Sequence, residues 1–146
     1  MSQAKFIETL GVVDLISEKH KQLRQITMER IGQRFEVRFS EMDIYLISLN
    51  QDNPMSLSES ARFMNISRQA VHKHAKHLTA LGFIQLVTSE ANRRDKVIKL
   101  TQAGQELSIK INDIKSELEA ELDAELGSEN YDQIRTLFRG HWKLRT

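Results

Sequence analysis

The chain has 146 residues, of which 40% are hydrophobic and 28% charged, a composition that suits a single globular domain with a modest core (residues 1–146). It contains no cysteine, which excludes disulfide bonds and thiol-based oxidant sensing within the chain. No apolar run of about eighteen residues and no signal-peptide pattern occurs, so we expect a cytoplasmic protein without a membrane partner.

The N-terminal region, residues 1–33, predicts a long amphipathic helix. Apolar residues recur at helical spacing from Phe6 to Ile26, and the pattern ends near Gly32. A second helix is expected to begin at Ser40, an N-cap residue that is followed by an acid at the third helical position, Asp43.

Residues 56–81 predict two helices that are joined by a short turn. Ser56 and Ser67 are typical N-cap residues, and each precedes an apolar pattern of helical period. Between them stands Asn65, which tolerates the left-handed backbone conformation found where a helix ends. Gly82 is expected to end the second helix. This order of elements is typical of a helix-turn-helix.

The second of these helices has an unusual exposed face. Its buried stripe is formed by Val71, Ala75, Leu78 and Leu81. Its exposed positions are Arg68, Gln69, His72, Lys73 and Lys76, and they include no carboxylate. A helix face that is merely solvated usually carries both signs of charge, whereas long donors near the start of a second helix suit the base edges and phosphates of a DNA major groove.

Residues 83–88 and 96–100 predict a β-hairpin, because both segments are rich in β-branched and aliphatic side chains and a polar run separates them. Its tip carries Arg93 and Arg94, and arginine is attracted to the negative potential of a narrow minor groove. A solvated turn is the alternative for the arginine pair alone. Together with the basic helix before it, the hairpin predicts a winged helix-turn-helix over residues 40–100 that binds double-stranded DNA.

Positive charge is concentrated in this part of the chain. Residues 62–99 contain eight Lys or Arg and two acids, a net charge of +6, although the whole chain carries only +1. The segment 101–126 is strongly acidic and is expected to face away from DNA. The asymmetry favours a local nucleic-acid footprint over general affinity for polyanions.

The C-terminal region, residues 101–146, predicts two further helices. The first has an apolar seam made of Leu107, Ile111, Ile114, Leu118, Leu122 and Leu126. Gly127 and Ser128 interrupt the pattern, and the last helix is expected to carry Tyr131, Ile134, Phe138 and Trp142. We expect residues 1–33 and 101–146 to pair between two subunits; an intramolecular helical hairpin in a monomer is the alternative.

The segment from Ser56 to Gly104 resembles the multiple antibiotic resistance regulator (MarR) family of bacterial transcription factors, and the resemblance extends over nearly the whole chain because the flanking helices have the lengths that family uses. The resemblance rests on Arg94 and on the run Leu100-Thr101-Gln102-Ala103-Gly104; it departs at Asn92, where the family usually has an aspartate. It implies a mainly α fold with a small β-hairpin (α+β), in which a winged helix-turn-helix is flanked by long N- and C-terminal dimerisation helices. It also implies a homodimeric repressor that a small aromatic or anionic ligand releases from a pseudo-palindromic operator.

The predicted contacts with DNA divide into three sets. Base edges are assigned to Arg68, Gln69 and His72, phosphates to Lys73, Lys76 and Lys96, and the minor groove to Arg93 and Arg94, with the capping residue Ser67 at the same helix end. An anionic effector is assigned to Arg34, Arg38 and Tyr45, for which surface charge and an ordinary core tyrosine are the alternative interpretation.

Two other functions stay open. The recognition segment also resembles metal-responsive regulators of the arsenic-repressor (ArsR) type, although cysteine is absent. Some winged helices bind protein instead of DNA. His72, His74 and His77 share one helix but are poorly spaced for chelation, so neither a metal site nor a cofactor is predicted. No catalytic motif occurs, and the chain is not expected to be an enzyme.

Overall fold

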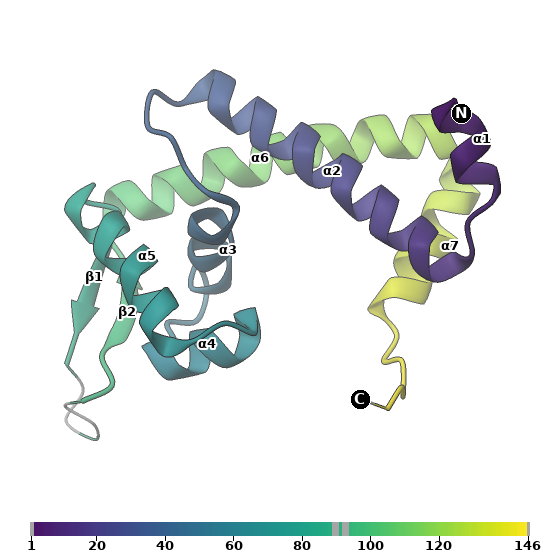
Figure 1. Cartoon of the computed structure of the whole chain (residues 1–146). Helices are drawn as coiled ribbons and strands as arrows, with labels where there is room; N and C mark the ends of the chain where they lie inside the picture. Colours follow the sequence, from purple (N-terminus) through teal and green to yellow (C-terminus); the bar gives the residue numbers. More distant parts are fainter. Residues whose placement is uncertain (1, 89–90, 92–93, 146) are drawn as a thin grey trace.

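The computed structural model describes residues 2–88, 91 and 94–145. In chain order the elements are α1 (Gln3–Glu8), α2 (Val12–Arg34), α3 (Glu41–Leu49), α4 (Leu57–Met64), α5 (Arg68–Ala80), β1 (Ile84–Val87), β2 (Val97–Leu100), α6 (Gln102–Leu126) and α7 (Ser128–Arg139). The fold is therefore mainly helical with one two-stranded antiparallel hairpin, as the sequence predicts. Elements α3, α4, α5 and the hairpin gather at one end, and we call them the winged unit (Figure 1).

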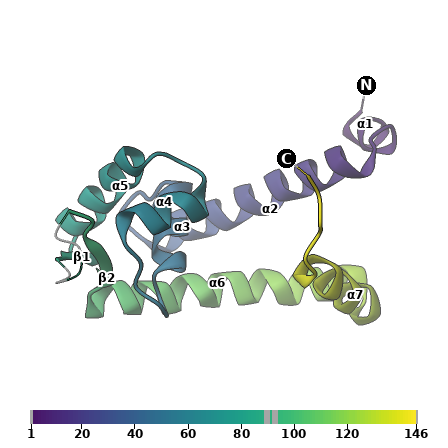
Figure 2. The same ribbon diagram turned by 90° about the horizontal axis from the view of Figure 1, so that it is seen from below.

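The two long helices connect the winged unit to the opposite end of the molecule. Helix α2 contacts α6, and both extend away from the hairpin toward α1 and α7 (Figures 1 and 2). Two ion pairs join them, from Arg30 to Glu121 and from Arg34 to Glu117. Part of the acidic surface of α6 is therefore matched by cations of α2.

Capping residues fix the helix-turn-helix as predicted. Ser56 Oγ accepts a hydrogen bond from the Glu59 amide, and Ser67 Oγ accepts one from the Ala70 amide. Asn65 ends α4 at φ 54° and ψ 43°, in the left-handed region that asparagine tolerates better than most residues. The turn between α4 and α5 is thus closed by local hydrogen bonding and by backbone conformation.

The hairpin is tied to the start of α4. Strands β1 and β2 pair from Ile84 opposite Leu100 to Val87 opposite Val97. The Ile98 amide donates to the Met55 carbonyl over 2.8 Å, so the residues just before α4 lie along the outer edge of β2. The wing is therefore anchored to the helix-turn-helix by backbone bonds as well as by side chains.

The Leu100-Thr101-x-x-Gly104 run joins the wing to α6. Leu100 is buried, and Thr101 caps α6 by accepting from the Gly104 amide. The Thr101 hydroxyl donates to the Gly82 carbonyl and its amide to the Phe83 carbonyl. The start of α6 is thereby fixed against the chain that leaves α5.

The N-terminal region differs from the single helix that the sequence predicts. Helix α1 ends after Glu8, and α2 begins at Val12 with Gly11 in an extended conformation, φ −76° and ψ 172°. The Thr9 hydroxyl donates to the Phe6 carbonyl at this break. The apolar residues keep their helical spacing across the break. The sequence pattern therefore cannot show that two helices are present instead of one.

The apolar seam of α6 also differs from its predicted role. Its first three members, Leu107, Ile111 and Ile114, are buried within the chain's own core beneath the winged unit. Leu118, Leu122 and Leu126 are half-buried. We expected the whole seam to pack against a second subunit. That expectation is wrong for its N-terminal half.

Exposed apolar side chains occur mainly at the opposite end of the molecule. They are Phe6, Val12, Val13, Ile134, Leu137, Phe138, Trp142 and Leu144, and we call them the terminal apolar patch. Trp142 lies beyond α7, where its indole donates to the Leu137 carbonyl and its ring packs 5.3 Å from that of Phe138. Of the helices that the structure describes, none has both the length and the apolar character needed to span a bilayer.

Candidate nucleic-acid interface

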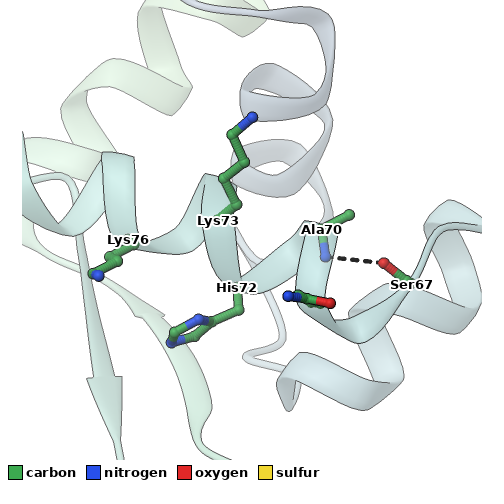
Figure 3. A pocket seen from close by; sticks show the side chains of 6 residues that line it. Ser67, Ala70, His72, Lys73 and Lys76 are labelled. Atoms are coloured by element: carbon green, nitrogen blue, oxygen red, sulfur yellow. Dashed lines mark hydrogen bonds between the residues drawn. The ribbon is translucent and has the colours of Figure 1, made fainter.

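The exposed face of α5 forms an open groove. It is lined by Ser67, Gln69, Ala70, His72, Lys73 and Lys76 (Figure 3). None of these six residues is acidic. The opposite face of α5 carries Val71, Ala75 and Leu78, all fully buried, which fixes the rotation of the helix and keeps the polar side chains outward. The structure thus brings together five of the nine predicted DNA contacts.

The groove side chains reach in different directions from the helix. His72 and Lys76 lie one turn apart, while Lys73 extends another way (Figure 3). The Gln69 amide can make the paired hydrogen bonds that recognise adenine, and lysine ammonium groups can contact phosphates as point charges. The groove therefore combines one group capable of reading a base with two lysines further along the helix.

Arg68, which the sequence assigns to base edges, contacts the wing. It is exposed but does not line the groove, because its guanidinium turns to the hairpin. One terminal nitrogen donates to the Arg94 carbonyl over 2.8 Å, and Nε lies 3.6 Å from Oδ1 of Asp95. The first residue of α5 thus holds the end of the wing.

Asp95 is a site residue that the sequence did not single out. Its Oδ1 also accepts from the Ser58 amide at 3.1 Å, in the first turn of α4. Partial burial acts to raise the pKa of the Asp95 carboxyl, but hydrogen bonds from Ser56 and Ser58 and the charge of Arg68 outweigh it and lower that pKa. The available signal was that Asp95 is one of only two acids in the basic segment 62–99.

The wing residues are placed in part. Arg94 is exposed at the end of the hairpin, whereas Arg93 and Asn92 lie outside the described residues. Lys96 is exposed, and its carbonyl accepts from the Leu57 amide at 3.0 Å. Arg94 and Lys96 are therefore two exposed cations on the segment that leads into β2.

His74 serves to fix α5 on α3. Its Nδ1 lies 2.9 Å from Oδ1 of the buried Asp43, and Nε2 of His77 lies 3.9 Å from the other oxygen. Asp43 also accepts from the Ser40 amide and so completes a capping box at the start of α3. Among the described residues, no group of three or more His, Cys, Asp or Glu side chains is placed to hold a metal ion.

The three residues assigned to an effector have separate surroundings. Arg34 pairs with Glu117 of α6, and Arg38 is exposed in the connection between α2 and α3. The Tyr45 hydroxyl donates to the Phe63 carbonyl of α4 over 3.3 Å. Arg34 and Tyr45 are thus engaged with different elements.

A second hollow lies between α2 and the start of α3. Its lining residues are His20, Lys21, Arg24, Gln25, Met28, Glu29 and Glu41. Nε of Arg24 lies 3.6 Å from a Glu41 oxygen, and the half-buried Lys115 of α6 donates to Ser48 of α3 over 3.1 Å. Burial and then the charge of Arg24 lower the pKa of the Lys115 ammonium. This junction of α2, α3 and α6 was not predicted, because it requires three distant segments to meet.

Comparison with known proteins locates the similarity in the fold. No protein-family model and no curated protein matches the sequence. Among solved structures, one described as MarR aligns with a TM-score of 0.80 at 17% identity, covering 95% of this chain and 90% of that one. The transcriptional regulator BldR from Sulfolobus solfataricus aligns with a TM-score of 0.72 at 16% identity, covering 95% and 99%.

A third similar structure is MepR, a transcription regulator of the Staphylococcus aureus multidrug efflux pump MepA. It aligns with a TM-score of 0.69 at 17% identity, covering 89% of this chain and 95% of that one. Because each alignment covers nearly the whole of both chains, the long flanking helices are part of the similarity as well as the winged unit. The chain has the winged-helix fold of MarR-type regulators, as the wing motif predicts.

Proposed function

We propose that this chain is a sequence-specific, double-stranded DNA-binding transcriptional regulator of the MarR type. The observation that carries the proposal is the groove on α5, where an amide, an imidazole and two lysines share a face without an acid. A carboxylate-free surface on the second helix of a helix-turn-helix matches the charge and the hydrogen-bonding needs of a major groove. The similar regulators support the same assignment through their fold.

The proposed docking places the N-terminal half of α5 in the major groove. Gln69 and His72 contact base edges in this arrangement, and Lys73, Lys76 and Lys96 contact phosphates. Arg93 and Arg94 enter the adjacent minor groove from the wing. Ser67 lies at the start of α5, where its Oγ accepts from the Ala70 amide, and the other first-turn amides can donate to a DNA phosphate.

A homodimer completes the proposal. The side chains of the terminal apolar patch belong to α1, the start of α2, α7 and the residues after α7, at the end of the molecule opposite the hairpin (Figure 1). Figure 2 shows α1 and α7 apart from each other at that end. A second copy packed there through a twofold axis would cover these side chains. It would also place two α5 helices about 34 Å apart, which is one turn of DNA and matches a pseudo-palindromic operator.

Repression and its release form the regulatory part of the proposal. A bound dimer would repress by competing with RNA polymerase for promoter DNA, and a small aromatic or anionic effector would release it. The junction of Arg24 and Lys115 supports such a ligand, because an anion would offset the burial of the Lys115 charge. Arg34, Arg38 and Tyr45 remain the alternative site, where an anion has to compete with Glu117 for Arg34.

The effector proposal is tested with matched probes. Benzoate should raise the thermal midpoint and weaken DNA binding, whereas benzamide, which has the same ring and no charge, should do neither. If the anion binds at the junction of Arg24 and Lys115, Lys115→Met should abolish the difference between the effects of benzoate and benzamide. Arg38→Gln should abolish it if the anion binds at the alternative site.

The DNA proposal is tested by selecting bound fragments from a random duplex pool with the full chain. Enrichment of a pseudo-palindromic sequence supports the proposal, and a pool that stays random under conditions where the protein is folded contradicts it. Binding that depended on added Zn²⁺ would favour the ArsR-like alternative. Failure to retain any duplex at low salt would favour the protein-interaction alternative.

A further inference from the structure

Asp95 and Arg68 connect three elements that must act together if the chain binds DNA. Arg68 is the first residue of α5, Asp95 lies just before β2, and Ser58 is in the first turn of α4. We propose that Asp95 is a positioning residue that, through Arg68, sets the wing at a fixed angle to the recognition helix. This inference rests on the proposed function, and it identifies the residues that orient the wing for DNA binding.

Several of these contacts meet at one carboxylate. Asp95 Oδ1 accepts from the Ser58 amide at 3.1 Å and lies 3.6 Å from Nε of Arg68. The same guanidinium donates to the Arg94 carbonyl at 2.8 Å. Arg68 therefore holds the backbone of the wing at the residue whose side chain is assigned to the minor groove, and Asp95 holds Arg68.

The burial of the two side chains agrees with this division of roles. The Asp95 side chain is 17% exposed, whereas that of Arg68 is 48% exposed. A carboxylate that is mostly covered and hydrogen-bonded to a helix N-terminus is fixed in place. Arg68 lies against it as a bridge, and a base-edge role for Arg68 would require both of its contacts to the wing to break.

The negative charge of Asp95 is unfavourable for DNA binding on electrostatic grounds alone. Residues 62–99 carry a net charge of +6, and a carboxylate in that segment repels the phosphates that the segment is proposed to bind. Removing the charge alone should therefore tighten DNA binding. A positioning role makes the opposite prediction, because the wing loses its fixed orientation. The sign of the change separates the two explanations.

The experiment compares Asp95→Ala with Glu59→Gln in the full chain, using an operator selected with the parent protein. Glu59 is an exposed acid in the same first turn of α4, so its variant removes a similar charge without touching the wing contact. We expect Asp95→Ala to weaken binding about tenfold, within the range for directly coupled neighbours. Glu59→Gln should bind equally or more tightly.

Three further variants complete the experiment, and the first guards against a loss of folding. Asp95→Asn keeps an oxygen that can accept from the Ser58 amide, and it replaces Asp95→Ala in the comparison if the alanine variant is unfolded by circular dichroism. Arg68→Ala and the double variant Arg68→Ala/Asp95→Ala complete a cycle. Because the two residues act as one unit, the double variant should lose no more affinity than Arg68→Ala alone.

Footprinting supplies a readout that unfolding would not produce. Hydroxyl radicals report the minor groove, where the wing is proposed to bind, and methylation of guanine N7 reports the major groove. Asp95→Ala should lose the minor-groove protection at the operator ends and keep the major-groove protection. A variant that had merely lost folded protein would lose both in proportion.

The outcomes separate this inference from the function on which it rests. If the parent protein selects no operator, the proposed function fails. If the parent binds its operator and a folded Asp95 variant binds as tightly or more tightly, DNA binding stands and the positioning role of Asp95 is overturned. Additive losses in the cycle would also overturn it, since they would show that Arg68 contacts DNA independently.

Discussion

Gly104 lies so close to Phe83 that a Cβ added to Gly104 would stand 1.9 Å from the Phe83 carbonyl oxygen. That carbonyl already accepts from the Thr101 amide, so neither partner can move away without loss of a hydrogen bond. The glycine of the Leu-Thr-x-x-Gly run is therefore required by the contact between α6 and the chain that follows α5. The motif therefore has a structural role, because it fixes the start of α6 against the chain between α5 and the wing.

Gly104→Ala should destabilise the protein by about 1–3 kcal/mol or more, because the added methyl overlaps backbone that cannot yield. Chemical denaturation followed by circular dichroism measures the change. Gly32→Ala is the control: Gly32 lies within α2, and a Cβ there meets nothing within 4 Å. That variant should be more stable than the parent by about 0.5–1 kcal/mol. Equal effects of the two substitutions would contradict the packing argument.

Asp95 should make stability depend on pH in a defined direction. The pKa of its carboxyl is lowered in the folded protein, so the ionised form stabilises the fold above the pKa of the unfolded chain, and this contribution is lost as the pH falls through the folded-state pKa. The difference in unfolding free energy between the parent and Asp95→Asn should therefore be largest near neutral pH and shrink in acid. Urea titrations across a pH series measure it; a difference that grew toward acid pH would have the wrong sign.

The terminal apolar patch should determine the oligomeric state. The parent is expected to sediment at twice 16.9 kDa at micromolar concentration. Leu137→Asp, at a side chain that is 62% exposed, should give a folded monomer. Ile109→Asp is the matched control, since Ile109 is 61% exposed and lies outside the patch. A parent that sediments as a monomer, or a Leu137 variant that stays dimeric, would exclude the proposed interface.

Local rules were enough to predict the helix-turn-helix. N-caps at Ser56 and Ser67 and the left-handed Asn65 follow from side-chain chemistry within a few residues, and the structure has all three. The face of α5 was predictable for the same reason, because Val71, Ala75 and Leu78 define its buried side. Where one residue type at a fixed spacing decides the outcome, sequence is sufficient.

Long-range pairing was not predictable by the same means. Asp95 and Arg68 lie far apart in the sequence, and only the packing of the hairpin beside α4 brings them together. The apolar period of α6 likewise indicates that the seam is buried, but it does not indicate which surface buries it. Leu107 and Ile111 pack into the chain's own core. Periodicity identifies a buried face, and the identity of the covering surface depends on tertiary structure.

In the proposed docking, the groove on α5 faces the DNA major groove, and the N-terminal end of the helix reads the bases. Gln69→Ala should erode the preference for operator over random duplex by roughly 1–3 kcal/mol, the range for a bidentate base contact. Lys76→Ala should weaken operator and random duplex alike and reduce the slope of log affinity against log salt by about 0.9 per lost phosphate contact. Lys19→Ala, an exposed cation on α2 away from the winged unit, should change neither quantity.

This docking is tested by fluorescence anisotropy titrations of the parent and these three variants over a salt series, on operator and on random duplex. We expect a loss of specificity for Gln69→Ala at an unchanged salt slope, and a reduced salt slope for Lys76→Ala at unchanged specificity. If Lys76→Ala altered specificity while Gln69→Ala altered only the salt slope, α5 would lie in the groove in the opposite orientation, and the proposed docking would be wrong.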